Sequence, residues 1–124
     1  MEVEYYPMET TRTVPFSAAV RVDQLLYLSG QIGIDQAGNL VPGGIVAETR
    51  QAIENIRLVL ERHGSSLDRV IKVTVMLADM SEWQLMNTVY VSYFSNHLPA
   101  RSSFGTTGLA LGARVEIECI AVLR

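Results

Sequence analysis

The chain has 124 residues, of which 48% are apolar and 19% charged, a composition that predicts one globular domain spanning residues 1–124. A net charge of −3 and the lack of any basic run argue against nucleic-acid binding, and no apolar stretch approaches the roughly 20 residues of a membrane span. The acidic first residues do not resemble a signal peptide, and the single cysteine, Cys119, suits a reducing compartment, so we expect a cytoplasmic protein.

The first half of the chain predicts strands followed by a helix. A short strand is expected near residues 13–20, and residues 23–34 are rich in strand formers although Gly30 and Gly33 interrupt them. A turn-rich loop follows at residues 35–44. Residues 46–63 carry apolar side chains at helical spacing, and Gly64 stands where a helix commonly ends.

The second half predicts a strand, a helix and two further strands. Residues 69–79 are apolar and β-branched, which indicates a buried strand. A second helix is expected to begin near Asp79 or Ser81, because each is followed three residues later by an acid or an amide, and to end before Pro99. Two final strands, residues 101–107 and 113–123, flank a glycine-rich joint.

This order of elements predicts an α+β fold, a mixed β-sheet with two helices on one face. The strand at residues 69–79 has apolar residues on both sides, whereas two helices cover one face only. A second copy of the chain is the simplest partner for the uncovered face. We therefore expect a homo-oligomer.

The last predicted strands carry the candidate site. Side chains alternate along a strand, so Glu116 and Glu118 share one face while Cys119 points to the other. We expect the strand that begins at Arg101 to be the neighbour of this strand, and the Arg101 guanidinium is suited to bind a carboxylate through two hydrogen bonds. Two interpretations remain open. One is a structural ion pair between Arg101 and one of the acids, at a sheet edge or a subunit contact, and the other is a site for a small carboxylate substrate.

The remaining titratable residues are weaker candidates. His63 ends the first predicted helix, where a cation suits the helix dipole, and His97 lies beside Pro99 near the expected cleft. Cys119 is interpreted as a small buried side chain. One cysteine and two histidines far apart in the sequence offer no ligand spacing, so no metal site is expected.

Three segments make the chain resemble the Rid family of reactive intermediate deaminases, also called YjgF or RidA. They are YLSGQIG at residues 27–33, NTVYVSYF at residues 87–94, and PARSSF at residues 99–104 with GARVEIECIAV at residues 112–122. The resemblance covers nearly the whole chain. It implies a chorismate-mutase-like subunit that assembles as a trimer with clefts between subunits.

The resemblance also implies an activity without metal or cofactor: hydrolysis of enamines and imines, such as 2-aminoacrylate, to 2-oxo acids and ammonia. By resemblance, Arg101 binds the substrate carboxylate and Glu116 positions a water and moves a proton. Ser29 and Gly30 line the pocket, and Ser103 stands where well-studied members carry cysteine. Phe16 replaces a common family tyrosine at the cleft mouth.

Two other functions stay open at this point. One is a specialised catabolic deaminase of the same fold. The other is a module that binds small 2-oxo acids or a protein partner without turnover, which the missing hydroxyl at Phe16 mildly favours. Glu118 is interpreted as a structural residue at a subunit contact.

Overall fold

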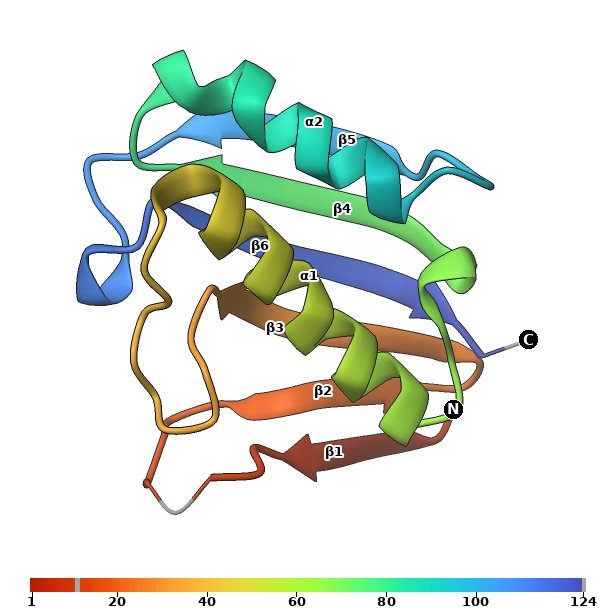
Figure 1. Cartoon of the computed structure of the whole chain (residues 1–124). Coiled ribbons are helices and arrows are strands. Elements are labelled where there is room, and N and C mark those ends of the chain that lie inside the picture. The colour runs from red at the N-terminus through yellow and green to blue at the C-terminus, as the bar shows by residue number, and fades with distance from the viewer. Residues whose placement is uncertain (11, 124) are drawn as a thin grey trace.

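The computed structural model describes residues 1–10 and 12–123, and its frame is one six-stranded sheet (Figure 1). The strands lie in the order β1-β2-β3-β6-β4-β5. Neighbours are antiparallel except β4 and β5, which are parallel. The strands are β1 (Val3–Pro7), β2 (Ser17–Val22), β3 (Leu25–Ile32), β4 (Val70–Leu77), β5 (Ala100–Gly105) and β6 (Val115–Val122).

Both helices, α1 (Gly44–Arg62) and α2 (Trp83–Tyr93), cover the same face of the sheet, which confirms the predicted α+β arrangement (Figure 1). Three short 3₁₀ turns, Leu67–Arg69, Met80–Glu82 and Ala110–Gly112, join the elements. The core lies between the sheet and the helices because apolar residues recur every second position in β6 and at helical spacing in α1. Its fully buried members include Ile53, Ile56, Leu60, Val73, Val75, Leu77, Val115 and Ile117. No helix within the described residues is long and apolar enough to cross a membrane.

The opposite face of the sheet is not covered within the chain. Tyr5, Val20, Tyr27 and Ile120 stand side by side across four strands on this face, and the side chain of Tyr5 is 71% exposed. Strand β4 adds Lys72, Thr74 and Met76 to it, so only Met76 of these three residues is apolar. We call this surface the open face.

The N-terminal part of the sheet departs from the prediction. Strand β1 was not expected, because Glu4 and Pro7 interrupt its apolar pattern and it lies exposed at the edge of the sheet. Strand β2 begins later than predicted, and it turns into β3 at Asp23, whose φ is 51°. Asp79 accepts a hydrogen bond from the Ser81 backbone N–H at 2.9 Å and so caps the turn before α2, close to the predicted start.

A buried carboxylate of α1, that of Glu48, holds the backbone just before β6. Glu48 is buried, and its Oε1 accepts a hydrogen bond from the backbone N–H of Arg114 at 2.8 Å. The Arg114 guanidinium in turn pairs with Glu82 at 2.7 Å. These contacts join α1, the segment before α2 and β6, and they set the position of Glu116 two residues further on.

Candidate active site

Arg101 lies near the start of β5, the edge strand, under the helix layer. Its ladder partner on β4 is Val73, which is buried beneath the helices, so the Arg101 side chain points to the helix-covered face. Its Nη1 donates a hydrogen bond to Asn87 Oδ1 at 2.7 Å. The guanidinium carbon lies 4.7 Å from the centre of the Tyr90 ring and 5.8 Å from that of Trp83, within cation–π range.

These three contacts of Arg101 come from one face of α2. Trp83, Asn87 and Tyr90 are spaced i, i+4 and i+7, which places them in a row along a helix. This set of contacts was not identified from the sequence. The available signal was the helical spacing of two aromatic residues and one amide, followed shortly by an arginine.

Glu116 lies in the middle of the sheet, on the open face. Its neighbours Val115 and Ile117 are fully buried beneath the helices, so the alternation of β6 turns Glu116 the other way. The side chain is partly buried, and this burial, helped by the nearby charge of Glu118, raises the pKa of the Glu116 carboxyl. No ion pair to Glu116 is present among residues 1–10 and 12–123.

Gly30 makes room for this carboxyl. The register of β3 against β6 shifts between Leu28 and Gln31, so Ser29 and Gly30 form an irregularity next to Glu116. A Cβ atom on Gly30 would lie 2.2 Å from Glu116 Oε2, so any other residue would displace the carboxyl. The Ser29 hydroxyl donates to the Ser17 carbonyl oxygen at 2.6 Å and links β3 to the start of β2.

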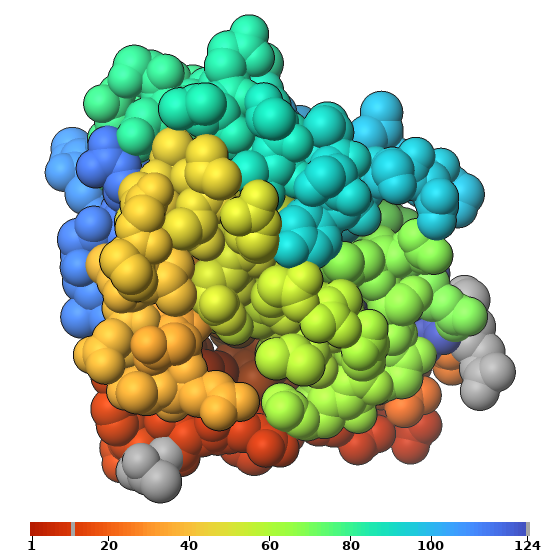
Figure 2. Space-filling view, viewed as in Figure 1, coloured from red at the N-terminus to blue at the C-terminus, as the bar shows by residue number. Residues whose placement is uncertain are grey.

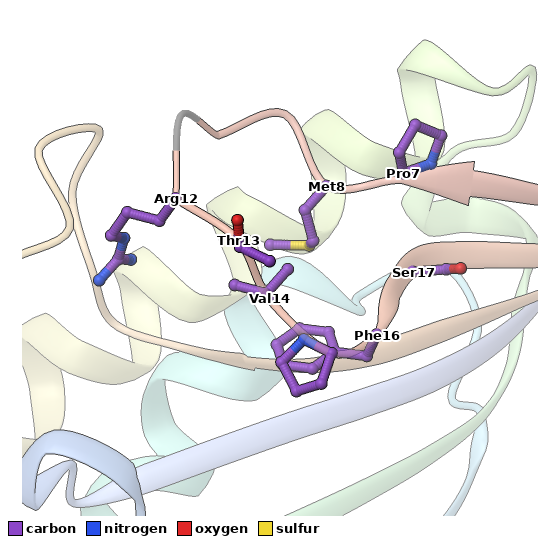
Figure 3. A pocket seen from close by; sticks show the side chains of 8 residues that line it. Pro7, Met8, Arg12, Thr13, Val14, Phe16 and Ser17 are labelled. Carbon is purple, nitrogen blue, oxygen red and sulfur yellow. The ribbon is translucent and has the colours of Figure 1, made fainter.

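A groove leads away from Glu116 and Gly30. It has a volume of about 690 Å³ and is also lined by Phe16, Leu111 and Leu58 of α1. Figure 2 shows the surface hollowed between the loop after β3 and α1. Phe16 also lines a smaller pocket of the N-terminal segment (Figure 3), from which Arg12 extends toward Gly38. The Phe16 side chain is 51% exposed, and its position at the mouth of a cleft stays a prediction.

Ser103 lies on the same side of β5 as Arg101, two residues further along. Its ladder partner Val75 is fully buried, and the Ser103 hydroxyl is itself buried with no hydrogen-bond partner among the described residues. A buried hydroxyl without a partner is costly. It is therefore available to a water or a ligand beside Arg101.

The structure sorts the predicted residues into two half-sites on opposite faces of the sheet. The arginine half-site holds Arg101 and Ser103, together with Trp83, Asn87 and Tyr90. The glutamate half-site holds Glu116, Gly30, Ser29 and Phe16.

This arrangement corrects one expectation about Arg101, the neighbour of its strand. It also limits the predicted structural ion pair to a subunit contact, where it stays a prediction. Strand β4 lies between β5 and β6, so the Arg101 strand is not the neighbour of the Glu116 strand. An ion pair of Arg101 with Glu116 or Glu118 is absent among the described residues, because the sheet itself separates the side chains.

The structure also places the other candidates. His63 caps the end of α1, and its ring stacks on Tyr6 at 4.0 Å; burial lowers its pKa. Cys119 is buried as predicted, and burial raises its pKa to about 12, which removes it as a nucleophile. His97 and Glu118 are exposed. No group of three metal-ligating side chains occurs in the part of the chain that the structure describes.

Comparison with known proteins places this arrangement in a family. The family model described as Endoribonuclease L-PSP matches residues 8–123. A mouse protein named 2-iminobutanoate/2-iminopropanoate deaminase is 47% identical over 109 residues, which are 87% of this chain and 81% of the mouse protein.

Two solved structures show the same fold over nearly the whole chain. The yeast protein YEO7 superimposes with a TM-score of 0.93 at 40% identity, covering 99% of this chain and 100% of the other. YyfA of Yersinia pestis, a protein of the Rid family, superimposes with a TM-score of 0.90 at 34% identity, covering 98% and 99%. The resemblance to the Rid proteins is thereby confirmed, and the chain belongs to the endoribonuclease L-PSP family that includes them.

Proposed function

We propose that the chain is a deaminase that hydrolyses imines and enamines of small 2-oxo acids, such as 2-aminoacrylate, to the 2-oxo acid and ammonia. The mouse relative named 2-iminobutanoate/2-iminopropanoate deaminase, at 47% identity, supports this reaction. The observation that carries it in this structure is a pair of partly buried charges, Arg101 and Glu116, without an ion-pair partner among the described residues. Charges left in this state are available to a substrate.

Arg101 supplies the anchor for the substrate. An imino acid carries a carboxylate, and a guanidinium binds a carboxylate through two parallel hydrogen bonds. Asn87 occupies one N–H of the guanidinium, which leaves others for the substrate. The unpartnered hydroxyl of Ser103 lies beside Arg101 and can hold a substrate oxygen or a water.

Glu116 handles water and protons. An enamine first tautomerises to an imine, and the Glu116 carboxylate then takes a proton from a water whose oxygen attacks the imine carbon. The proton passes to the imine nitrogen and gives a carbinolamine. A second proton then moves from the carbinolamine hydroxyl to the amine, the C–N bond breaks as the C=O bond forms, and ammonia leaves. Because burial raises its pKa, the Glu116 carboxyl is a stronger base than an exposed glutamate. Every step is a proton transfer, an addition or an elimination.

We propose that Arg101 of one subunit meets Glu116 of the partner subunit. One chain places these side chains on opposite faces of its sheet, so a single copy cannot direct both at one substrate. The open face carries the exposed side chains of Tyr5 and Tyr27, and exposed apolar surface of this kind commonly packs against a partner. A homotrimer with a cleft at each contact, as the Rid resemblance implies, satisfies both requirements.

The direct test is turnover of freshly generated 2-aminoacrylate, supplied by a dehydratase and followed by the loss of enamine absorbance and the release of ammonia. We expect the chain to accelerate both well beyond the rate in buffer. A correctly assembled protein that leaves the buffer rate unchanged would contradict the proposal and favour a binding module. An RNA-cleavage assay should be run in parallel to test for the activity that the family description, Endoribonuclease L-PSP, names.

The cytoplasmic location and the single-domain organisation stay predictions. The first is tested by cell fractionation with an antibody, and the second by limited proteolysis. A membrane-bound or secreted pool would contradict the first prediction. Two separately stable fragments would contradict the second.

A further inference from the structure

We propose that Trp83, Asn87 and Tyr90 are positioning residues that hold Arg101 for the substrate carboxylate without neutralising its charge. The proposal rests on the assignment of Arg101 as the substrate anchor. We call the three residues the neutral cradle. The cradle fixes the guanidinium from one side and leaves its full positive charge and its remaining N–H groups to an anion.

The contacts of the other partly buried arginines show why the cradle is unusual among the described residues: Arg21, for example, lies 3.9 Å from Glu4. Arg114 pairs with Glu82, and Arg57 pairs with Glu54 and Glu61. A carboxylate partner neutralises the guanidinium and occupies its donors. Arg101 instead contacts two aromatic rings and one amide oxygen, and no acid lies within 4.0 Å of it among the described residues.

Each member of the cradle contributes an interaction that leaves room for a substrate anion. The ring of Tyr90, buried in the core, and the ring of Trp83 attract the cation through their π faces, which accept none of its N–H groups in a conventional hydrogen bond. The amide of Asn87 accepts one N–H at 2.7 Å and carries no charge. Because the three residues lie on one rigid helix, they set the orientation of the guanidinium before substrate arrives.

The sharpest test is Asn87→Asp, which keeps the shape of the side chain but supplies a carboxylate. An aspartate at this place would pair with Arg101 and preserve the fold, yet it would compete with the substrate for the guanidinium. A merely structural residue would tolerate the change. Gln84→Glu is the matched control, because it adds the same charge to an exposed position of the same helix.

The readout is the binding of pyruvate, a stable 2-oxo acid, to the assembled protein. Trp83 is the only tryptophan of the chain and lies next to Arg101, so its fluorescence reports binding there directly. We expect a saturable change in emission, a pyruvate dissociation constant raised at least about tenfold in Asn87→Asp, and no more than about a twofold change in Gln84→Glu. The KM for the imine should rise with it while the melting temperature is kept.

Two further variants test how much the aromatic ring of Trp83 contributes to binding. Trp83→Leu should weaken pyruvate binding, measured by calorimetry, about twofold to fivefold, and Trp83→Phe should restore it in part.

Binding by Asn87→Asp equal to the wild type would overturn the proposal, as would a wild type without any saturable response to pyruvate. Binding of pyruvate with the expected pattern but without imine turnover would support the cradle and contradict the proposed enzyme activity. The two proposals therefore fail separately.

Discussion

Replacing Gly30 with alanine should disable the reaction while leaving the fold intact. The new Cβ would lie 2.2 Å from Glu116 Oε2, whereas ordinary contact begins at 3.4 Å, so the carboxyl oxygen must retreat by about 1 Å. A displacement of this size at a reacting group costs about a hundredfold in kcat, equivalent to about 3 kcal/mol of activation free energy. The backbone at Gly30 is not in the left-handed region, so alanine fits it without strain.

The assay compares kcat, the pH–rate profile and the melting temperature of Gly30→Ala with those of Gly105→Ala. Gly105 is also a strand glycine with an unstrained backbone. Its Cβ would come too close only to the flexible Met80 side chain, at 2.9 Å, and would lie at an ordinary 4.0 Å from the Leu77 carbonyl oxygen, so the kcat of Gly105→Ala should stay near that of the wild type. In Gly30→Ala the carboxyl moves away from the burial that raises its pKa, so the acid limb of the profile should shift to lower pH. A folded Gly30→Ala with wild-type kcat would refute the role given to the Glu116 carboxyl.

Three further predictions concern single side chains of the two half-sites. Arg101→Ala should abolish ammonia release from 2-aminoacrylate while light scattering still shows the wild-type oligomer; unfolding or dissociation instead would point to a structural role for this arginine. Glu116→Gln should lower kcat far more than it changes KM, and it should not lower the melting temperature. Because the pKa of Glu116 is raised on folding, the folded state binds this proton more tightly than the unfolded state does. The free energy of unfolding of the wild type therefore falls as the pH rises from the ordinary pKa of a glutamate to the raised value. Glu116→Gln should be more stable than the wild type above this pH range and equally stable below it. Phe16→Tyr should move the ratio of kcat/KM values toward 2-aminoacrylate and away from the larger leucine-derived imine by about threefold to tenfold, the value of one hydrogen bond; an unchanged ratio would show that residue 16 does not face the substrate.

The sequence predicted the helices and most of the sheet because their patterns are strong. The alternation in residues 115–122 predicted that Glu116 and Ile117 lie on different faces of the sheet. The spacing of Ile53, Ile56 and Leu60 identified the buried face of α1. Strand β1 escaped because an exposed edge strand needs little apolar pattern.

The geometry of the site was less predictable than its residues. Strands β5 and β6 follow one another in the sequence and were therefore expected to be neighbours in the sheet. In the structure β4 lies between them, because the order of strands is set by the whole fold and not by the sequence order alone. The separation of Arg101 from Glu116 follows from that insertion and from the alternation of each strand. The contact between Gly30 and Glu116 depends on an irregularity in β3 that no pattern in the sequence marks.

The proposed function requires each active site to combine Arg101 of one subunit with Glu116 of the partner subunit. Mixing the two inactive variants Arg101→Ala and Glu116→Gln tests it most directly, after subunits are exchanged by mild denaturation and the mixed oligomers are verified by native mass spectrometry. In an equal mixture of trimers, about one quarter of the clefts would receive both intact side chains, so about a quarter of the wild-type rate should return. Verified mixed trimers with no recovered activity would place both residues of each site in one chain and contradict the account.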